Sequence, residues 1–165
     1  GGVGKTTLAK HVYNRLMREY EGHVVWVTVS QEFTIKSLQD KIARFLGVKL
    51  EDEDEEAFRA TTLNTFLSEK KISVLMLDDM WEKIDMRKVG CTFSRESCRL
   101  IVTTRSAEVC HRIGCNKLIP VVKLGKDEAW KLFIETLENE TELGPEVEEI
   151  AKSMAEVCDG LPLAF

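Results

Sequence analysis

The chain begins with a glycine-rich segment, GGVGKTT (Gly1 to Thr7), that runs directly into a stretch with helical spacing of apolar residues. Glycine adopts backbone conformations with positive φ and lets the main chain approach an anion closely. The first turn of a helix also carries N–H groups without a helical partner, at the positive end of the helix dipole. A glycine-rich turn at a helix start therefore predicts a binding site for phosphate groups.

Two polar side chains extend this pattern. Lys5 adds a positive charge for terminal phosphates and Thr6 offers a hydroxyl to Mg²⁺, so the segment matches most of the P-loop pattern G-x-x-x-x-G-K-[ST]. The leading glycine of that pattern and the strand before it would precede Gly1, so we expect the first strand of the sheet to be missing. Because a bare G-K-T also occurs by chance, a glycine turn that only caps a helix stays the alternative.

The rest of the chain predicts helices alternating with strands. The expected helices cover residues 8–20, 35–46, 58–67, 107–113, 127–137 and 146–157, and the expected strands cover residues 23–30, 73–81, 99–106 and 118–122. Most of these strands are apolar at successive positions, as in a parallel sheet buried on both faces. Pro120 would place the last strand at an edge. The pattern predicts an α/β fold with a parallel sheet and flanking helices.

The second expected strand ends in two carboxylates, Asp78 and Asp79. The carboxyl ends of parallel strands border the crevice in which α/β sheets bind ligands. Since side chains alternate in direction along a strand, we expect the two residues to have different roles. Asp78 can hold Mg²⁺ through water, and Asp79 can face an attacking water or the γ-phosphate. The structural alternative is an ordinary turn at the Asp-Asp pair.

The third expected strand ends in Thr103, Thr104 and Arg105. Polar side chains at that edge can sense a γ-phosphate, and Arg105 can neutralise its charge. The structural alternative is a helix N-cap at Ser106 with Glu108 in the first turn, and both interpretations can hold together.

Composition limits the classes of partner. Lysine and arginine number 23 against 28 acidic residues, a net charge of −5, which disfavours nucleic acid. Five cysteines without a C-x-x-C pattern predict reduced, mostly buried thiols of a cytosolic protein rather than a metal site. The acidic run at residues 51–56 predicts a solvated loop that leads into a helix.

Six segments resemble, in order and spacing, the NB-ARC nucleotide-binding domain of plant intracellular immune receptors with leucine-rich repeats. They are GGVGKTTLAKHVYN, VVWVTVS, LMLDDMW, CRLIVTTRS, LGKDEAWKLF and GLPLAF. Because Trp81 follows the Asp pair, the chain resembles the branch of this family whose members bear a coiled coil. The resemblance covers essentially the whole chain and implies a P-loop NTPase sheet in residues 1–140, followed by the start of a helical ARC subdomain in residues 141–165.

The resemblance implies a defence-response switch that rests with ADP and signals with ATP, with slow hydrolysis and Mg²⁺ as a cofactor. Thr6 and Asp78 would hold the metal, and Asp79 and Arg105 would act in hydrolysis, Arg105 as the sensor arginine. Pro162 would pack on the adenine. The residues implied to contact the nucleotide are Gly1, Gly2, Val3, Gly4, Lys5, Thr6, Thr7, Arg105 and Pro162.

The implied partners are the receptor's own N-terminal and leucine-rich-repeat domains, and oligomerisation in the ATP state. The implied location is cytoplasmic, with membrane association of the full-length protein left open. One rival hypothesis is a turnover P-loop ATPase or kinase, and another is an ATP-dependent DNA-binding regulator, which the acidic balance disfavours. With the first strand missing, we also expect two strands to lack their shared neighbour and the isolated chain to be unstable.

Overall fold

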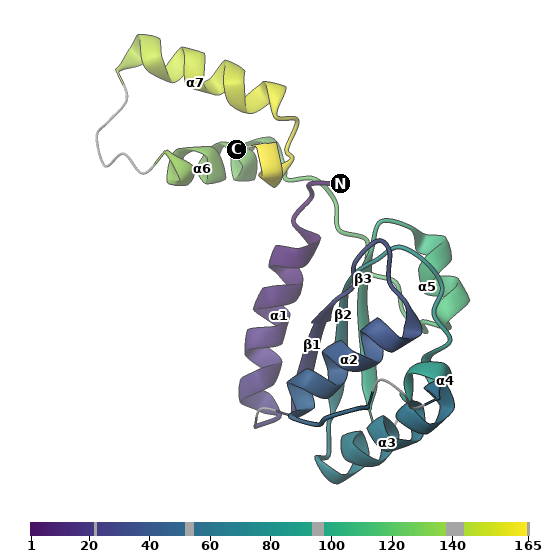
Figure 1. Ribbon diagram of the computed structural model, residues 1–165. Helices are drawn as coiled ribbons and strands as arrows, with labels where there is room; N and C mark the ends of the chain where they lie inside the picture. The colour runs from purple at the N-terminus through teal and green to yellow at the C-terminus, as the bar shows by residue number, and fades with distance from the viewer. Residues whose placement is uncertain (22, 52–54, 94–97, 138–143, 165) are drawn as a thin grey trace. The chain divides into compact units, whose positions relative to one another are not determined.

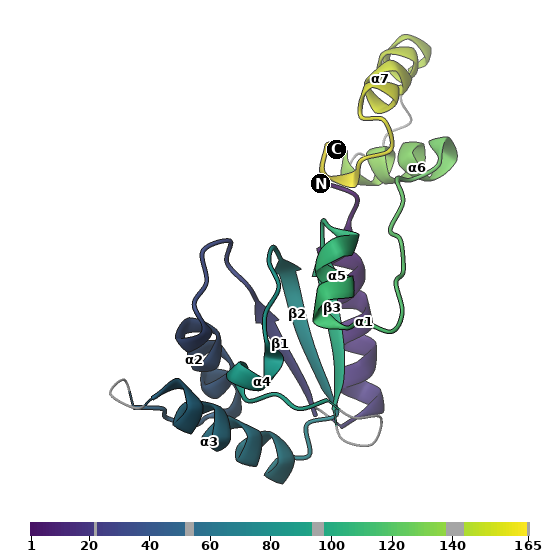
Figure 2. The same ribbon diagram turned by 90° about the vertical axis from the view of Figure 1, so that its right-hand side faces the viewer.

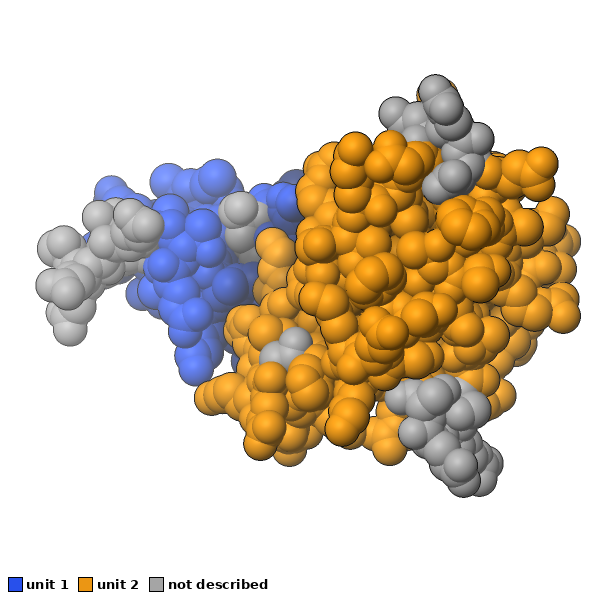
Figure 3. All heavy atoms as spheres, turned by 60° about the horizontal axis from the view of Figure 1, so that its bottom comes forward, with its two compact units in different colours: residues 1–5, 119–165 blue, residues 6–118 orange. Residues whose placement is uncertain are grey.

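A computed structural model of the chain describes residues 1–21, 23–51, 55–93, 98–137 and 144–164. The chain divides into two compact units, coloured separately in Figure 3. Unit 1 combines residues 1–5 with residues 119–165, and unit 2 comprises residues 6–118. The domain boundary that we predict between residues 140 and 141 lies outside the described residues, as do residues 52–54 of the acidic run.

Unit 2 is built on a parallel sheet of three strands that lie in the order β1 (Val24–Thr28), β2 (Val74–Met80) and β3 (Arg99–Thr104). Figure 1 shows the three strands side by side. Runs of apolar residues, many of them β-branched, favour this pleated and doubly covered arrangement. The predicted α/β fold with a parallel sheet is confirmed.

The expectation that two strands would lack a shared neighbour was wrong for the described strands. The central strand β2 bonds directly to β1 on one side and to β3 on the other, with Val74 opposite both Val24 and Arg99. Because unpaired buried N–H and C=O groups are costly, direct pairing of these strands satisfies backbone groups that would otherwise lack partners.

The expected strand at residues 118–122 was also wrong, because the structure gives this segment no regular secondary structure. Ile119 is 70% exposed and Val122 is 75% exposed. Pro120 has no N–H to donate to a neighbouring strand. A short run of β-branched residues therefore does not by itself make a strand when no sheet edge receives it.

In the described part of residues 5–118, five helices accompany the sheet, and the first begins at Lys5, the last residue of unit 1 before Thr6. They are α1 (Lys5–Glu19), α2 (Ile35–Leu46), α3 (Glu56–Glu69), α4 (Met86–Val89) and α5 (Ala107–Ile113). The bounds of α2 and α5 are those predicted. Local signals explain α2, since Thr34 and Ser37 form a capping box and Gly47 ends the helix at φ 68°. The short helix α4 was not predicted.

The two faces of the sheet carry different helices. Val25 and Leu77 belong to a core that includes Leu38 of α2 and Leu63 of α3. The alternate strand residues, such as Val24 and Met76, pack with Ala9 and neighbouring apolar residues of α1. Figures 1 and 2 show α1 and α2 on opposite faces. With both faces covered, the carboxyl ends of the strands are held in fixed register at one edge of the sheet.

A buried arginine connects the helices on the α2 face. Arg59 of α3 is 1% exposed, and its Nε donates to Gln39 Oε1 at 3.0 Å. Its Nη1 donates to the main-chain oxygen of Glu51 at 2.7 Å, and its Nη2 pairs with Asp40. A buried charge needs such partners, so this network ties α3 to α2.

Unit 1 contains the helices α6 (Lys126–Thr136) and α7 (Pro145–Val157) and the 3-10 helix η1 (Pro162–Ala164). Its small core joins Phe133 to Ala151 and Ala155, and Trp130 packs against it. These helices confirm the two predicted near the end of the chain. Within the part of the chain that the structure describes, no helix is long and apolar enough to cross a membrane.

Candidate functional site

The strand β2 ends in a bulge at its two consecutive carboxylates. Pairing with β3 shifts between Leu77 and Met80, so Asp78 and Asp79 together lie opposite the single residue Thr103. Asp79 has φ 59°, a left-handed conformation that aspartate tolerates better than most residues. A bulge redirects the side chains on either side of it. The regular alternation that we expected from a strand is therefore interrupted at this point, and the bulge sets the directions of the two carboxylates.

Asp78 is buried and accepts hydrogen bonds from two hydroxyl groups. It is 4% exposed. Thr6 Oγ1 lies 3.1 Å from its Oδ1 and 3.2 Å from its Oδ2, and Thr103 Oγ1 donates to Oδ1 at 2.6 Å. The donors come from the first turn of α1 and from β3, so three elements of unit 2 meet at one carboxylate.

This group of oxygens suits a small divalent cation. Carboxylate and hydroxyl oxygens are ligands that Mg²⁺ accepts, usually with waters and substrate phosphates completing the shell. Among the described residues, no group of three or more His, Cys, Asp and Glu side chains can hold a metal ion by itself. A cation at Asp78 and Thr6 would therefore take its remaining ligands from water or from a bound phosphate.

The Asp79 side chain has different partners from the Asp78 side chain, although Thr103 contacts both residues. The Asp79 N–H donates to Thr103 Oγ1 at 2.9 Å, and Asp79 Oδ2 accepts a hydrogen bond from Trp81 Nε1 at 3.1 Å. Arg105 Nε lies 3.8 Å from Asp79 Oδ1, and the guanidinium lies 4.6 Å from the centroid of the Trp81 ring. The side chains of Asp79 and Arg105 are 37% and 55% exposed. This carboxylate is therefore open to solvent and close to a cation.

The residues after β3 form the start of α5, which confirms the predicted helix N-cap at Ser106. Ser106 is the N-cap of that helix, and Glu108 lies in its first turn. The Ser106 side chain makes no capping hydrogen bond, whereas its N–H donates to Thr104 Oγ1 at 3.1 Å. Arg105 thus lies between a strand end and a helix start, which fixes its main chain beside Asp79.

The glycine loop lies in unit 1, where it packs against the last described turn of the chain. Gly2 and Gly4 have φ of 81° and 86°, so both need the freedom of glycine. Leu163 donates its N–H to the Gly2 oxygen at 3.2 Å, and a Cβ at Gly4 would lie 3.8 Å from Pro162 Cγ. The loop leads directly into α1, which begins at Lys5.

The structure brings several of the predicted site residues into contact. In unit 2, Thr6 meets Asp78, and Asp79 meets Arg105. In unit 1, Pro162 lies beside the glycine loop that contains Gly1 to Gly4. Lys5 and Thr6 are consecutive in the chain, and Val3 and Thr7 belong to the same glycine-rich segment, Gly1 to Thr7.

The sequence analysis did not predict the contacts that two side chains make at this site. Thr103 was noted only as a candidate phosphate sensor, although its hydroxyl contacts both Asp78 and the Asp79 main chain. Trp81 was noted only as a mark of a branch of the family, although it contacts both Asp79 and Arg105. The clue to Thr103 was its place at the end of a strand next to β2. The clue to Trp81 was its spacing of two residues from Asp79.

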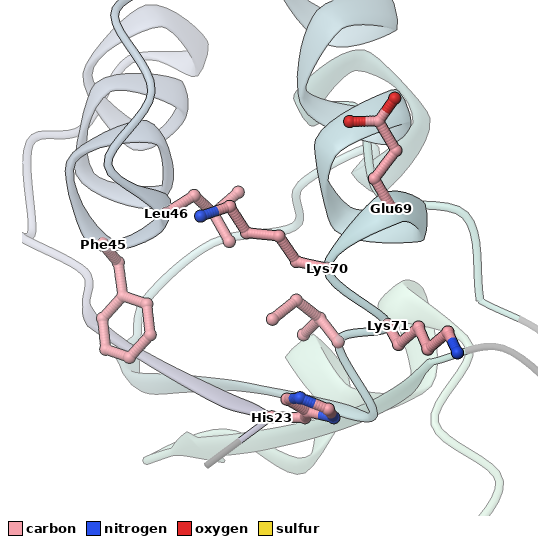
Figure 4. Close-up of a pocket in the computed structure, with 7 residues that line it drawn as sticks. His23, Phe45, Leu46, Glu69, Lys70 and Lys71 are labelled. Carbon is pink, nitrogen blue, oxygen red and sulfur yellow. The ribbon is translucent and has the colours of Figure 1, made fainter.

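A separate cavity of about 450 Å³ lies at the other end of the sheet (Figure 4). Its lining comes from the residues before β1 and β2 and from the ends of α2 and α3: His23, Phe45, Leu46, Glu69, Lys70, Lys71 and Ile72. The predicted site residues do not line it. Because α/β sheets bind ligands at the carboxyl ends of their strands, this cavity is not the candidate site.

The five cysteines are free thiols. The prediction that the thiols are mostly buried was wrong, because only Cys91 and Cys110 are buried and the other three are partly exposed. Burial, with a smaller contribution from neighbouring Cys98, raises the pKa of Cys91 to about 12. Burial likewise raises the pKa of Cys98 to about 11. These two thiols are therefore protonated and unreactive near neutral pH.

Comparison with known proteins gives a consistent set of relatives. Residues 1–142 match the family described as the NB-ARC domain. Over the whole chain, identity is 40% with the probable disease resistance protein At5g63020, 39% with disease resistance protein UNI and 41% with the probable disease resistance protein At4g14610, all of Arabidopsis thaliana. The chain spans 19%, 19% and 24% of these proteins, respectively.

Proposed function

This chain belongs to the NB-ARC domain family, a family of nucleotide-binding domains, and on that basis we propose that it is the ATP- and ADP-binding switch of a plant immune receptor. The switch rests with ADP, signals with ATP and returns by slow hydrolysis. The observation that carries the proposal is the buried Asp78 carboxylate, which accepts hydrogen bonds from Thr6 and Thr103. Thr6 follows Lys5 directly in the sequence, so the residue that contacts the Asp78 carboxylate comes immediately after the glycine-rich loop.

The glycine loop binds the phosphates and Mg²⁺. The main chain of residues 1–7 would contact the β- and γ-phosphates, and Lys5 would supply a positive charge. Thr6 and Asp78 would hold Mg²⁺, which would supply positive charge for the terminal phosphate. The positive φ of Gly2 and Gly4, the start of α1 at Lys5 and the Thr6–Asp78 hydrogen bonds support this assignment.

Asp79 and Arg105 act on the γ-phosphate. Asp79 orients the attacking water, and Arg105 compensates the negative charge that develops during transfer. Their partial exposure supports this assignment, because water and a phosphate must reach both groups. Pro162 packs on the adenine, and its position beside the glycine loop agrees with that role.

The same proposal covers the domain organisation and the rest of the receptor. Residues 1–140 form the P-loop domain and residues 141–165 begin the helical ARC subdomain. In the full-length receptor, which is cytoplasmic, the N-terminal and leucine-rich-repeat domains are the partners, and the ATP-bound state oligomerises. The relatives are disease resistance proteins about five times as long as this chain, which supports a place within a larger receptor.

Replacement of Lys5 in the full-length receptor tests the proposal. Lys5→Ala should raise the Kd for ADP by at least about 100-fold, because it removes a charge-assisted contact to phosphate. Lys10→Ala, an exposed lysine on the same helix, is the matched control and should leave the Kd unchanged. Calorimetric titration with ADP measures both. Equal ADP affinity of the two variants would refute the proposed site.

The rate of hydrolysis separates the switch from its rival. A switch hydrolyses ATP far more slowly than the roughly 10 s⁻¹ that is typical of enzymes, whereas a turnover ATPase or kinase approaches that rate. Steady-state phosphate release by the full-length protein distinguishes the two. A rate near the typical enzyme value would favour the turnover enzyme.

A further inference from the structure

Trp81 contacts both of the residues that we assign to hydrolysis. Its Nε1 donates to Asp79 Oδ2 at 3.1 Å, and its ring lies 4.6 Å from the Arg105 guanidinium carbon. We propose that Trp81 is a positioning residue for ATP hydrolysis, which uses its N–H to orient the Asp79 carboxylate and its ring face to hold Arg105. This inference rests on the proposed function and adds a residue to its mechanism.

The Asp79–Arg105 pair does not fix its own geometry. The 3.8 Å separation of Arg105 Nε and Asp79 Oδ1 exceeds the roughly 2.7–2.9 Å of a charge-assisted hydrogen bond. Both side chains are more than a third exposed, so solvent screens their attraction. An additional group must therefore limit the conformations of both side chains, and Trp81 contacts both of them.

Tryptophan suits this task because its indole combines an N–H donor with a large electron-rich face. The donor recognises a carboxylate oxygen, and the face attracts a guanidinium. Phenylalanine offers only the face and leucine offers neither group. The strand fixes where the indole lies, because Trp81 follows the last residue of β2 and stands two positions after Asp79. The Asp79 main chain is itself anchored through Thr103 Oγ1.

Two substitutions in the full-length receptor separate these contributions. Trp81→Leu should lower the kcat of ATP hydrolysis about tenfold, because a small displacement of a catalytic group costs up to about 100-fold. Trp81→Phe keeps the ring and loses one hydrogen bond, so kcat should fall about threefold. The Kd values for ADP and ATP should stay within about threefold in both variants, because neither contact holds the nucleotide.

Trp26→Phe is the matched control. The Trp26 indole N–H also donates to a neighbouring side chain, Thr28 Oγ1, and its ring packs edge-on against Tyr13 in the same unit. Trp26→Phe therefore removes an equivalent donor from β1, a strand other than the one that carries Asp79. Its kcat should equal that of the wild type.

A double-mutant cycle tests whether Trp81 acts through Asp79. Asp79→Asn should slow hydrolysis, and addition of Trp81→Phe, which removes only the donor to residue 79, should then lower kcat no further. Addition of Trp81→Leu should still lower kcat, because that variant also loses the contact with Arg105. A merely structural tryptophan would make Trp81→Phe lower kcat by the same factor in both backgrounds, which would overturn the inference.

The cycle also distinguishes the failure of this inference from the failure of the proposed function. If Asp79→Asn slows hydrolysis and neither Trp81 variant does, only the role of Trp81 is refuted. If Asp79→Asn itself leaves kcat unchanged, the proposed role of Asp79 is wrong and the inference falls with it.

Discussion

Two neighbouring carboxylates at the end of β2 lie in opposite surroundings. In the Asp78 cluster (Thr6, Asp78 and Thr103), the carboxylate is buried and its donors are hydroxyl groups. The Asp79 cluster (Asp79, Trp81 and Arg105) is partly exposed and contains a cation and an indole. One bulge separates the two clusters.

The contrast shows how one strand end can serve two chemical tasks. In the part of the chain that the structure describes, Asp79 forms an ion pair with Arg105, whereas Asp78 forms none. Hydroxyl donors do not compensate the negative charge of a carboxylate, and the Mg²⁺ that we propose at Asp78 would do so. The charge of Asp79 is already opposed by Arg105. We therefore expect substitutions at Asp78 to impair metal-dependent binding, and substitutions at Asp79 to impair turnover.

The largest effect should follow Asp78→Ala in the full-length receptor. With Mg²⁺ present, the Kd for ATP should rise by about 100-fold or more, because the variant lacks the carboxylate that we propose as a metal ligand. With the metal chelated, the variant and the wild type should bind ATP with similar affinity. Calorimetry under both conditions measures the difference. Equal losses with and without Mg²⁺ would show that Asp78 does not act through the metal.

The sequence predicted where the polar groups of both clusters would lie. Apolar runs ending in Asp78 and Arg105 placed these residues at the carboxyl edge of a parallel sheet, and the structure places them there. The bounds of α2 were readable because its caps, Thr34 and Gly47, are local signals. Features that depend on neighbouring positions along the chain are thus accessible to sequence reasoning.

Features that depend on distant segments were not accessible. The bulge at Asp79 arises from the register between β2 and β3, which no local pattern records. Arg59 is buried only because groups from α2 and from the segment before α3 surround its guanidinium. The approach of Pro162 to Gly4 joins the two ends of the chain, and here only the family resemblance indicated a shared site.

A smaller effect on binding and a specific effect on turnover should follow Asp79→Ala. Loss of a general base or water-orienting group lowers kcat by about 100-fold, so ATP should persist on the protein for longer. The Kd values for ATP and ADP should stay within about threefold of the wild type. Single-turnover hydrolysis and calorimetry together measure this separation. If Asp79→Ala loses ATP as readily as Lys5→Ala, the proposed division between the clusters is wrong.

Thr103 links the two clusters, and its substitution should have a moderate effect on both. Its hydroxyl donates to Asp78 Oδ1 and accepts from the Asp79 N–H. Thr103→Val keeps the shape and removes both hydrogen bonds, which should lower the free energy of unfolding by about 1–3 kcal/mol. Thr103→Ser restores the hydroxyl and should recover most of this loss. Urea unfolding of the receptor variants measures the change, and equal stability of the Val and Ser variants would contradict the linking role.

The smallest effect at neutral pH concerns a buried thiol that is most stable without charge. Burial raises the pKa of Cys91 from 9.0 to about 12. Its contribution to stability is complete below pH 9, where the thiol is protonated in both states. Above pH 9 the unfolded thiol ionises first, so the free energy of unfolding should fall by about 1.4 kcal/mol per pH unit until about pH 12.

Removal of the Cys91 thiol isolates this contribution from the tyrosines and lysines that ionise in the same range. Cys91→Ala should lose some stability at pH 7 through the smaller side chain, but its stability should then decline less steeply above pH 9. Urea unfolding between pH 7 and pH 11 measures both slopes. If stability falls equally steeply with pH in the wild type and in Cys91→Ala, the Cys91 thiol ionises as readily in the folded state as in the unfolded state. In that case burial would not explain why the core holds this thiol in its uncharged form.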